Sequence, residues 1–176
     1  MKFAGIDVGL RNSTMAVISG GKAEIYRDYR TGISERIVAA GIDAPLSFPE
    51  KGFFRECERR LIERGIKLFP SGSPFFKRVV ERGIEIAYEF EKIGIQVFEV
   101  YPFATRVLLD IAPDCNKRKK SCLNDIKKEL ENYVTAEINT HDEADAVISA
   151  LTVKMFFEGQ GELVSGKDGS ILIPKK

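Results

Sequence analysis

The chain has 176 residues, of which 44% are hydrophobic and 30% are charged. A chain of this length and apolar content can bury one sizeable core, so we expect a single domain over residues 1–176. The 27 Lys and Arg residues nearly balance the 26 Asp and Glu residues. The resulting net charge of +1 argues against a protein that coats nucleic acid, and it leaves room for a local basic patch that faces a substrate.

No stretch of about 18 apolar residues is present, and a strand pattern begins at residue 2. We therefore expect no transmembrane helix, no signal peptide, no membrane partner and a cytoplasmic location. The three cysteines, at 57, 115 and 122, are an odd number at spacings unhelpful for pairing, which fits a reducing compartment. Cys115 and Cys122 with the single His141 form a weak alternative zinc site, since no C-x-x-C pair is present.

The first predicted strand, KFAGIDVG over residues 2–9, is an apolar run that ends on Asp7 and a glycine. Such a run is typical of a buried central strand that presents a side chain at its carboxyl end. Burying an unpaired charge is costly, so the carboxylate of Asp7 needs a basic partner, backbone N–H donors or a cation.

Residues 14–19 and 22–29 are predicted to form the next two strands, joined by the hairpin turn Gly20-Gly21. The polar turn before them contains Arg11. The first three strands therefore form an antiparallel meander, and residues 31–36 are expected to make a short connection of about one helical turn.

The tetrapeptide Ala-Gly-Ile-Asp of residues 4–7 recurs at residues 40–43, where a proline at 45 stops the fourth strand. If the two strands are parallel neighbours, about 4.8 Å apart, Asp7 and Asp43 lie at the same end of the sheet. That arrangement outlines a metal site. The alternative is that four common residues recur by chance.

Prolines and glycines break residues 46–73 into short pieces, of which residues 54–63 are predicted to form a helix. Arg55 and Arg59 on this helix form either a solvated face or a surface that guides phosphates past the site. A helix is predicted from Pro74 to about residue 92, with Ser73 as its N-cap. A right-handed crossover then leads to a fifth, parallel strand over residues 95–102, with Glu99 near its carboxyl end.

A short helix over residues 104–110 precedes a basic loop at residues 113–120, which is either simply solvated or in contact with nucleic acid. Ser121 is predicted to cap a helix that ends near residue 133. The last segment, residues 162–173, is predicted to form a terminal hairpin around a glycine-containing turn.

Residues 140–157 predict a helix whose start is fixed by a capping box of Thr140 and Glu143. Asp142 and Asp145 then share one face of the helix, and alanines beside Asp145 permit a close approach to a sheet. A favourable interaction with the helix dipole explains Asp142 well, but it explains Asp145 less well, because Asp145 lies deeper beside an apolar run.

This succession of elements resembles the ribonuclease H-like fold of Holliday-junction resolvases and many transposases. Asp7 matches the acid of the first strand in that fold and Asp43 the acid of the fourth. The segment 142–146, DEADA, resembles the D-x-x-D-A helix of the resolvases. More narrowly, the chain resembles the family called domain of unknown function 429, described as predicted nucleases, on GIDVG (5–9), IDAPL (42–46), the segment 55–65, EVYP (99–102) and DEADA.

The resemblance implies an α/β, ribonuclease H-like domain with a five-stranded mixed sheet, flanking helices and a C-terminal hairpin. Carboxylates at these positions suit two-metal phosphoryl chemistry with Mg²⁺ or Mn²⁺, because oxygen ligands select hard cations. We assign Asp7 as the bridging ligand, Asp43 and Asp145 as outer ligands, and Asp142, also a candidate ligand, with Glu99 as supporting groups of the catalytic set. The side chains expected to bind nucleic acid are Arg11, Arg55, Arg59, Lys117, Arg118 and Lys119.

The sequence is also compatible with two other classes of function. The chain could be a binding module that has the fold without turnover. It also resembles, through Asp7-Val8-Gly9 followed by Ser13 and Thr14, the first phosphate loop of the actin, Hsp70 and sugar-kinase ATPases, which need a second domain that we do not expect in this sequence. DNA and RNA substrates are not distinguished, and the resolvase resemblance allows a homodimer.

Overall fold

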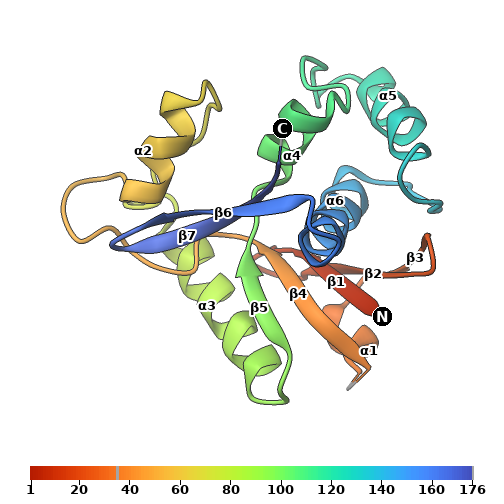
Figure 1. Cartoon of the computed structure of the whole chain (residues 1–176), viewed down its shortest axis with the longest axis horizontal. Coiled ribbons are helices and arrows are strands. Elements are labelled where there is room, and N and C mark those ends of the chain that lie inside the picture. Colours follow the sequence, from red (N-terminus) through yellow and green to blue (C-terminus); the bar gives the residue numbers. More distant parts are fainter. Residues whose placement is uncertain (35, 176) are drawn as a thin grey trace.

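The computed structural model describes residues 1–34 and 36–175, which form a mixed sheet with helices on both faces and a separate hairpin (Figure 1). The five strands of the sheet lie in the order β3-β2-β1-β4-β5. β1 is antiparallel to β2 and parallel to β4, β2 is antiparallel to β3, and β4 is parallel to β5. The strands are β1 (Lys2–Asp7), β2 (Thr14–Ser19), β3 (Lys22–Tyr26), β4 (Ile37–Asp43) and β5 (Gln96–Glu99).

The order and directions of these strands are those of the ribonuclease H-like fold, which confirms the predicted fold class. The described residues also form six helices and a hairpin of two strands. Their bounds are α1 (Tyr29–Gly32), α2 (Glu56–Glu63), α3 (Lys77–Glu91), α4 (Pro102–Leu109), α5 (Lys120–Leu130), α6 (His141–Phe157), β6 (Gly161–Gly166) and β7 (Gly169–Pro174).

Alternation along the two central strands sends side chains to different helices on the two faces of the sheet. On one face, Ile6 and Ile42 are buried with Phe90 of α3. On the other face, Phe3 and Ala39 are buried with side chains of α6 and β7. Asp7 and Asp43 end the two strands, and the alternation places them on the same face as Phe3 and Ala39, toward α6.

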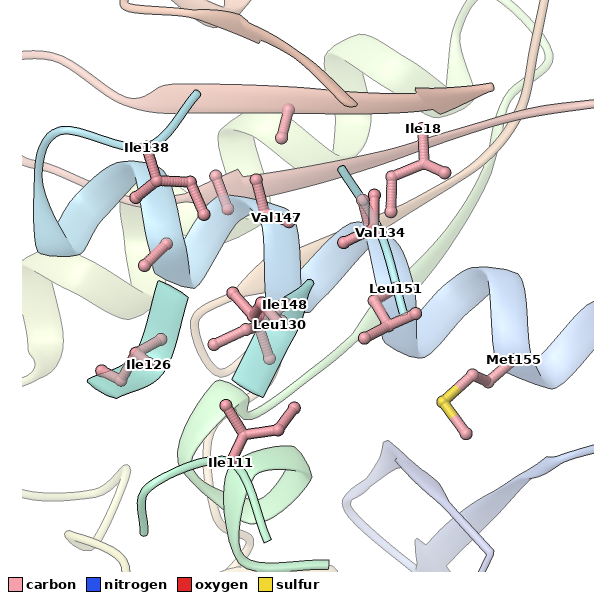
Figure 2. Close-up of a cluster of buried hydrophobic side chains, with 14 of the residues drawn as sticks. Ile18, Ile111, Ile126, Leu130, Val134, Ile138, Val147, Ile148, Leu151 and Met155 are labelled. Carbon is pink, nitrogen blue, oxygen red and sulfur yellow. The ribbon is translucent and has the colours of Figure 1, made fainter. Parts of the chain in front are cut away.

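The largest buried cluster lies where α6 meets α5 and the first half of the sheet (Figure 2). α6 is hydrophobic on most sides and almost wholly buried, as expected for a helix enclosed by other elements. The labelled members of the cluster are Ile18, Ile111, Ile126, Leu130, Val134, Ile138, Val147, Ile148, Leu151 and Met155.

The C-terminal hairpin joins the edge of the sheet and gives α2 and α4 a core of their own. Leu172 of β7 forms an isolated parallel bridge with Val100, just beyond β5. Val164, Ile171 and Ile173 are buried with residues of α2 and α4. The hairpin is therefore part of the packed structure, as predicted.

Several element boundaries differ from the prediction for local reasons. The third strand stops at Tyr26 because the side chain of Asp28 accepts a hydrogen bond from the N–H of Arg30 and caps α1. Ser73 and Pro74 form a turn and do not cap a helix, since the N–H of Phe76 donates to the carbonyl of Ser73, and α3 begins only at Lys77.

Two further helices begin earlier than predicted. α4 begins at Pro102, a residue well suited to the first helical position because it has no N–H to satisfy. α5 begins at Lys120, with Lys119 at the N-cap, so Ser121 lies inside the helix and is not its cap. The fifth strand is correspondingly short and ends at Glu99.

The prediction that the cysteine spacings are unhelpful for pairing is wrong for two of the three residues. Cys115 and Cys122 form a disulfide that closes the basic loop onto the start of α5, while Cys57 is buried and free. The sequence spacing of seven residues becomes favourable for pairing because the loop turns back on itself. The disulfide also excludes the alternative zinc site that used these two thiols.

Within residues 1–34 and 36–175, no helix is both long enough and apolar enough to cross a membrane.

Candidate functional site

The repeated tetrapeptide pairs with itself across the centre of the sheet. β1 and β4 are parallel and in register from Ala4 opposite Ala40 to Asp7 opposite Asp43. Because parallel strands in register share the orientation of their side chains, the two carboxylates leave the sheet at the same end and on the same face. The predicted juxtaposition of Asp7 and Asp43 is therefore confirmed.

A third carboxylate joins this pair from helix α6. Asp7, Asp43 and Asp145 each offer one carboxylate oxygen, and the three oxygens all lie within 4.8 Å of one another. Asp145 is buried, and the two strand acids are partly buried. Among the described residues, these three form the group of acids, histidines and cysteines whose spacing suits a metal ion.

Glycine on both central strands lets α6 come close enough to place Asp145. A Cβ on Gly5 would lie 2.2 Å from the carbonyl oxygen of Ala146 and 2.2 Å from the backbone nitrogen of Ala150. A Cβ on Gly41 would lie 2.9 Å from the carbonyl oxygen of Ser149. The backbones of helix and sheet are thus nearly in contact, which only residues without a side chain permit at this position.

The capping box of α6 fixes where the helix begins. The Thr140 hydroxyl accepts from the N–H of Glu143 at 3.1 Å, and the Glu143 carboxylate accepts from the N–H groups of Asn139 and Thr140 at 2.6 and 3.3 Å. This start places Asp142 in the exposed first turn and Asp145 one turn further in, against the sheet. The predicted cap is confirmed.

Burial, together with the crowding of negative charge, raises the pKa values of the two strand acids. Burial, followed by the charges of Asp145 and Asp142, raises the pKa of Asp7 from 3.8 to about 7, against an opposing effect of Lys117. Burial raises the pKa of Asp43 as well, together with the charges of Asp145 and Asp7. Asp142 therefore lies near enough to act on Asp7 electrostatically, although it is outside the group of three.

Lys117 of the basic loop reaches into the site. Its ammonium forms an ion pair with Oδ2 of Asp145, whereas the sequence predicts a residue that contacts substrate. Oδ1 of Asp145 is buried and has no hydrogen-bond partner among the described residues. An oxygen without a partner, next to two acids with raised pKa values, fits a divalent cation bound by Asp7, Asp43 and Asp145.

Glu99 ends the fifth strand as predicted, but its side chain and that of Arg55 do not lie with the three acids. Glu99 is paired with Ile42, one residue before Asp43, so its side chain leaves the opposite face of the sheet. There it accepts two hydrogen bonds from the guanidinium of Arg55, and both side chains are buried. Glu99 is therefore not among the candidate ligands, and Arg55 is not exposed to bind a substrate.

The remaining basic residues of the predicted set lie on the surface. Arg11, Arg118 and Lys119 are exposed, the last two in the loop that also carries Lys117. Arg59 is exposed on α2, where it lines a hollow with Lys167 and Asp168, away from the hollow that contains Asp43. The structure thus brings Lys117 to the acids, buries Arg55, and leaves the other four side chains of the predicted set exposed on the surface.

A hollow of about 110 Å³ beside Asp43 is a feature that the sequence analysis missed. Tyr101 and Phe69 form part of its wall. The Tyr101 hydroxyl donates to the carbonyl of Lys67 at 2.9 Å, and burial, with the charges of Asp43 and Asp145, raises its pKa to about 12. The available signal was the position of Tyr101 just beyond the fifth strand, two residues after Glu99.

No protein-family model matches the chain, so membership of the domain of unknown function 429 family is not confirmed, and no curated protein matches its sequence. Two solved structures are similar to it. One is described as the Thermus thermophilus RuvC structure, with 15% identity, a TM-score of 0.47 and coverage of 97% of this chain and 99% of that chain. The other, T. thermophilus RuvC in complex with Holliday junction substrate, has 16% identity, a TM-score of 0.46 and the same coverage.

Proposed function

We propose that the protein is a metal-dependent nuclease that hydrolyses phosphodiester bonds in nucleic acid. The observation that carries the proposal is the convergence of Asp7, Asp43 and Asp145 within 4.8 Å at one end of the sheet. Three carboxylates at that distance repel one another, and burial, followed by this repulsion, raises the pKa values of Asp7 and Asp43. A site of this kind is stabilised by divalent cations, and Mg²⁺ and Mn²⁺ prefer oxygen ligands.

The roles of the acids follow from their positions. Asp7 lies on the central strand and, with Asp43 and Asp145, would hold the divalent cations. Asp142, exposed in the first turn of α6, adds negative charge that acts on Asp7. Bound Mg²⁺ or Mn²⁺ would supply an activated water and stabilise the leaving oxygen of the phosphodiester.

The basic loop is the proposed contact for the nucleic acid backbone. A cation held by Asp145 would compete with the ammonium of Lys117, which would then be free to contact a phosphate. Arg118 and Lys119 are exposed beside it. A few local cations suit a protein with a net charge of only +1, because they attract a phosphate backbone without making the whole surface basic.

The experiment is a cleavage assay with single-stranded DNA, duplex DNA, a four-way junction and RNA in the presence of Mn²⁺. We expect Asp7→Asn to lower the rate on the preferred substrate by about 100-fold or more, since each ligand contributes several kcal/mol of charge stabilisation. Asp125→Asn, which changes an exposed acid of α5, is the matched control and should retain full activity. Unchanged hydrolysis by Asp7→Asn, in a preparation free of contaminating nuclease, would refute the proposal.

A binding module without turnover is the second candidate function, and the Lys117–Asp145 ion pair favours it. In that case the protein's own ammonium would serve as the permanent partner of the acids. Binding of a nucleic acid from the same panel, with no cleavage at any Mn²⁺ concentration, would select this function over the nuclease.

A further inference from the structure

A buried ion pair next to Asp43 has no part in the proposed chemistry. Arg55, at the N-cap of α2, donates from Nη1 to Oε2 of Glu99 at 2.7 Å and from Nη2 to Oε1 at 2.5 Å. Its three other N–H groups donate to Oε1 of Glu58, twice, and to the hydroxyl of Ser47. All five N–H donors of the guanidinium are used, so contacts with three side chains fix its position.

The ion pair is connected to the chain that follows Asp43. Oε2 of Glu99 also accepts from the N–H of Leu46 at 2.9 Å, three residues after Asp43. The intervening Pro45 has no N–H, so the first hydrogen bonds recorded for this exit segment are those of Leu46 and Ser47. On the other side of Asp43, the carbonyl of Ile42 accepts from the N–H of Val100 at 3.0 Å.

Asp43 needs such support because its neighbours repel it. Its carboxylate lies beside those of Asp7 and Asp145, and without a cation this repulsion acts to turn the side chain and its exit segment outward. Backbone anchors on both sides of Asp43 oppose that movement. The guanidinium fork in turn fixes the carboxylate that forms one of these anchors.

We propose that Glu99, held by Arg55, is a positioning residue that keeps Asp43 in place for cation binding. The inference rests on the metal site of the proposed function and assigns residues that act on the site through the backbone. Fold stability alone is a weak explanation for the pair, because well-packed apolar side chains usually stabilise a core at least as well as a buried salt bridge.

Three substitutions distinguish a role of Glu99 in positioning Asp43 from an effect of its charge and from an effect on the packing of the core. Glu99→Met removes both the charge and the acceptor for Leu46. Glu99→Gln removes the charge but keeps an amide oxygen that can accept from the same N–H. Glu58→Met removes the other carboxylate that contacts the same guanidinium and leaves the hydrogen bond between Glu99 and Leu46 in place. Glu99→Met and Glu58→Met are comparable in charge, because each leaves Arg55 paired with one buried carboxylate.

The measurement is the affinity for Mn²⁺ alone, from the free Mn²⁺ signal in electron paramagnetic resonance, together with the thermal unfolding midpoint of each variant. We expect Glu99→Met to weaken Mn²⁺ binding by about 10-fold or more, the usual effect of losing a group that supports a metal ligand. Glu99→Gln and Glu58→Met should each weaken it by less than about threefold, although Glu58→Met should lower the unfolding midpoint as much as Glu99→Met does.

If Glu99→Met does not fold, Arg55→Lys replaces it in the comparison. This substitution keeps every charge but loses the fork, and it should also weaken Mn²⁺ binding by about 10-fold. The positioning role would be overturned if Glu99→Gln weakened Mn²⁺ binding as much as Glu99→Met does. It would also be overturned if Glu58→Met weakened Mn²⁺ binding as much as Glu99→Met does. Either result would leave the metal site intact. Absence of Mn²⁺ binding by the unsubstituted protein would overturn the metal site and the positioning role together.

Discussion

At the scale of single residues, Asp7 links the site to the stability of the protein. Its pKa of about 7 in the folded state exceeds the ordinary value of 3.8, so between these pH values the folded state holds a proton that the unfolded state has released. The free energy of unfolding of the metal-free protein therefore falls as the pH rises from about 4 to about 7. Asp43, whose pKa is also raised, acts in the same direction.

We predict that Asp7→Asn stabilises the metal-free protein at pH 8, by about 1 kcal/mol or more, since one unit of pKa shift corresponds to about 1.4 kcal/mol. Thermal unfolding at pH 5 and pH 8, without metal, should show a smaller fall in the midpoint for the variant than for the unsubstituted protein. Saturating Mn²⁺ at pH 8 should raise the midpoint of the unsubstituted protein alone. A variant that loses stability at pH 8 would contradict the repulsion between the acids.

Lys117 supports a second prediction. Its ammonium, about half exposed, competes with a cation for Asp145, and such an ion pair is worth about 0.2–1 kcal/mol. Lys117→Met should therefore tighten Mn²⁺ binding by about two- to fivefold in a titration, while Lys119→Met, in the same loop but with no ion pair among the described residues, should leave it unchanged. Weaker binding by Lys117→Met would mean that the lysine supports the bound state.

The acids themselves could be predicted from the sequence, but the place of Glu99 could not. Asp7 and Asp43 end identical tetrapeptides, and the register of the sheet follows from that repeat. Glu99 also ends a strand, but its partner is Ile42, and an offset of one residue turns its side chain to the other face. Sequence patterns do not determine register at that accuracy for a strand of four residues.

At the scale of elements, the approach of α6 to the sheet determines whether the three acids meet. The atoms nearest to an added methyl on Gly5 belong to the backbone of α6 at 2.2 Å, and a backbone cannot rotate away. On Gly41 the nearest atoms lie at 2.8–3.0 Å and include side-chain atoms of Val153 and Val100. The two glycines therefore differ in tolerance although they are neighbours in the sheet.

We predict that Gly5→Ala costs about 3 kcal/mol or more of the free energy of unfolding and that Gly41→Ala costs about 1–2 kcal/mol, within the usual range for overpacking. Chemical denaturation of both variants tests the difference. Gly5→Ala should also weaken Mn²⁺ binding more than Gly41→Ala does, because it displaces Asp145. Equal costs for both substitutions would show that α6 shifts freely.

The boundaries of elements were predicted well where a side chain contacts the local backbone, as Thr140 does at the start of α6. They were predicted less well where contacts with residues distant in the sequence determine where an element begins or ends. Ser73-Pro74 has the residues of a helix start but forms a turn before α3, and the disulfide of the basic loop depends on a fold-back that local patterns do not describe.

At the scale of the whole molecule, the nearly balanced charge limits how nucleic acid can be bound. With a net charge of +1, affinity has to come from a few local cations, and the proposed contacts are those of the basic loop, Lys117, Arg118 and Lys119. Three phosphate contacts on duplex DNA correspond to a slope of about −2.7 in a plot of log affinity against log salt concentration. The slope is therefore a measure of how local the contact is.

We predict a slope between about −2 and −3 for the Asp7→Asn variant, which should bind duplex DNA without cleaving it, measured by fluorescence anisotropy. Arg118→Ala should reduce the magnitude of the slope by about one. Arg59→Ala, on α2 in the hollow that Lys167 and Asp168 also line, should leave it unchanged. A slope steeper than about −6 would indicate a much wider basic surface than the proposed loop.

Gly5 and Gly41 also affect which substitutions the whole molecule can accumulate. Where side chains separate two layers, the thickness of the gap changes with each substitution. Here main-chain atoms separate α6 from β1, and their dimensions are the same in every protein. The distance between Asp7 and Asp145 therefore does not depend on which side chains fill the surrounding core. The apolar cluster around α6 can exchange one side chain for another over evolutionary time while the spacing of the three carboxylates stays constant.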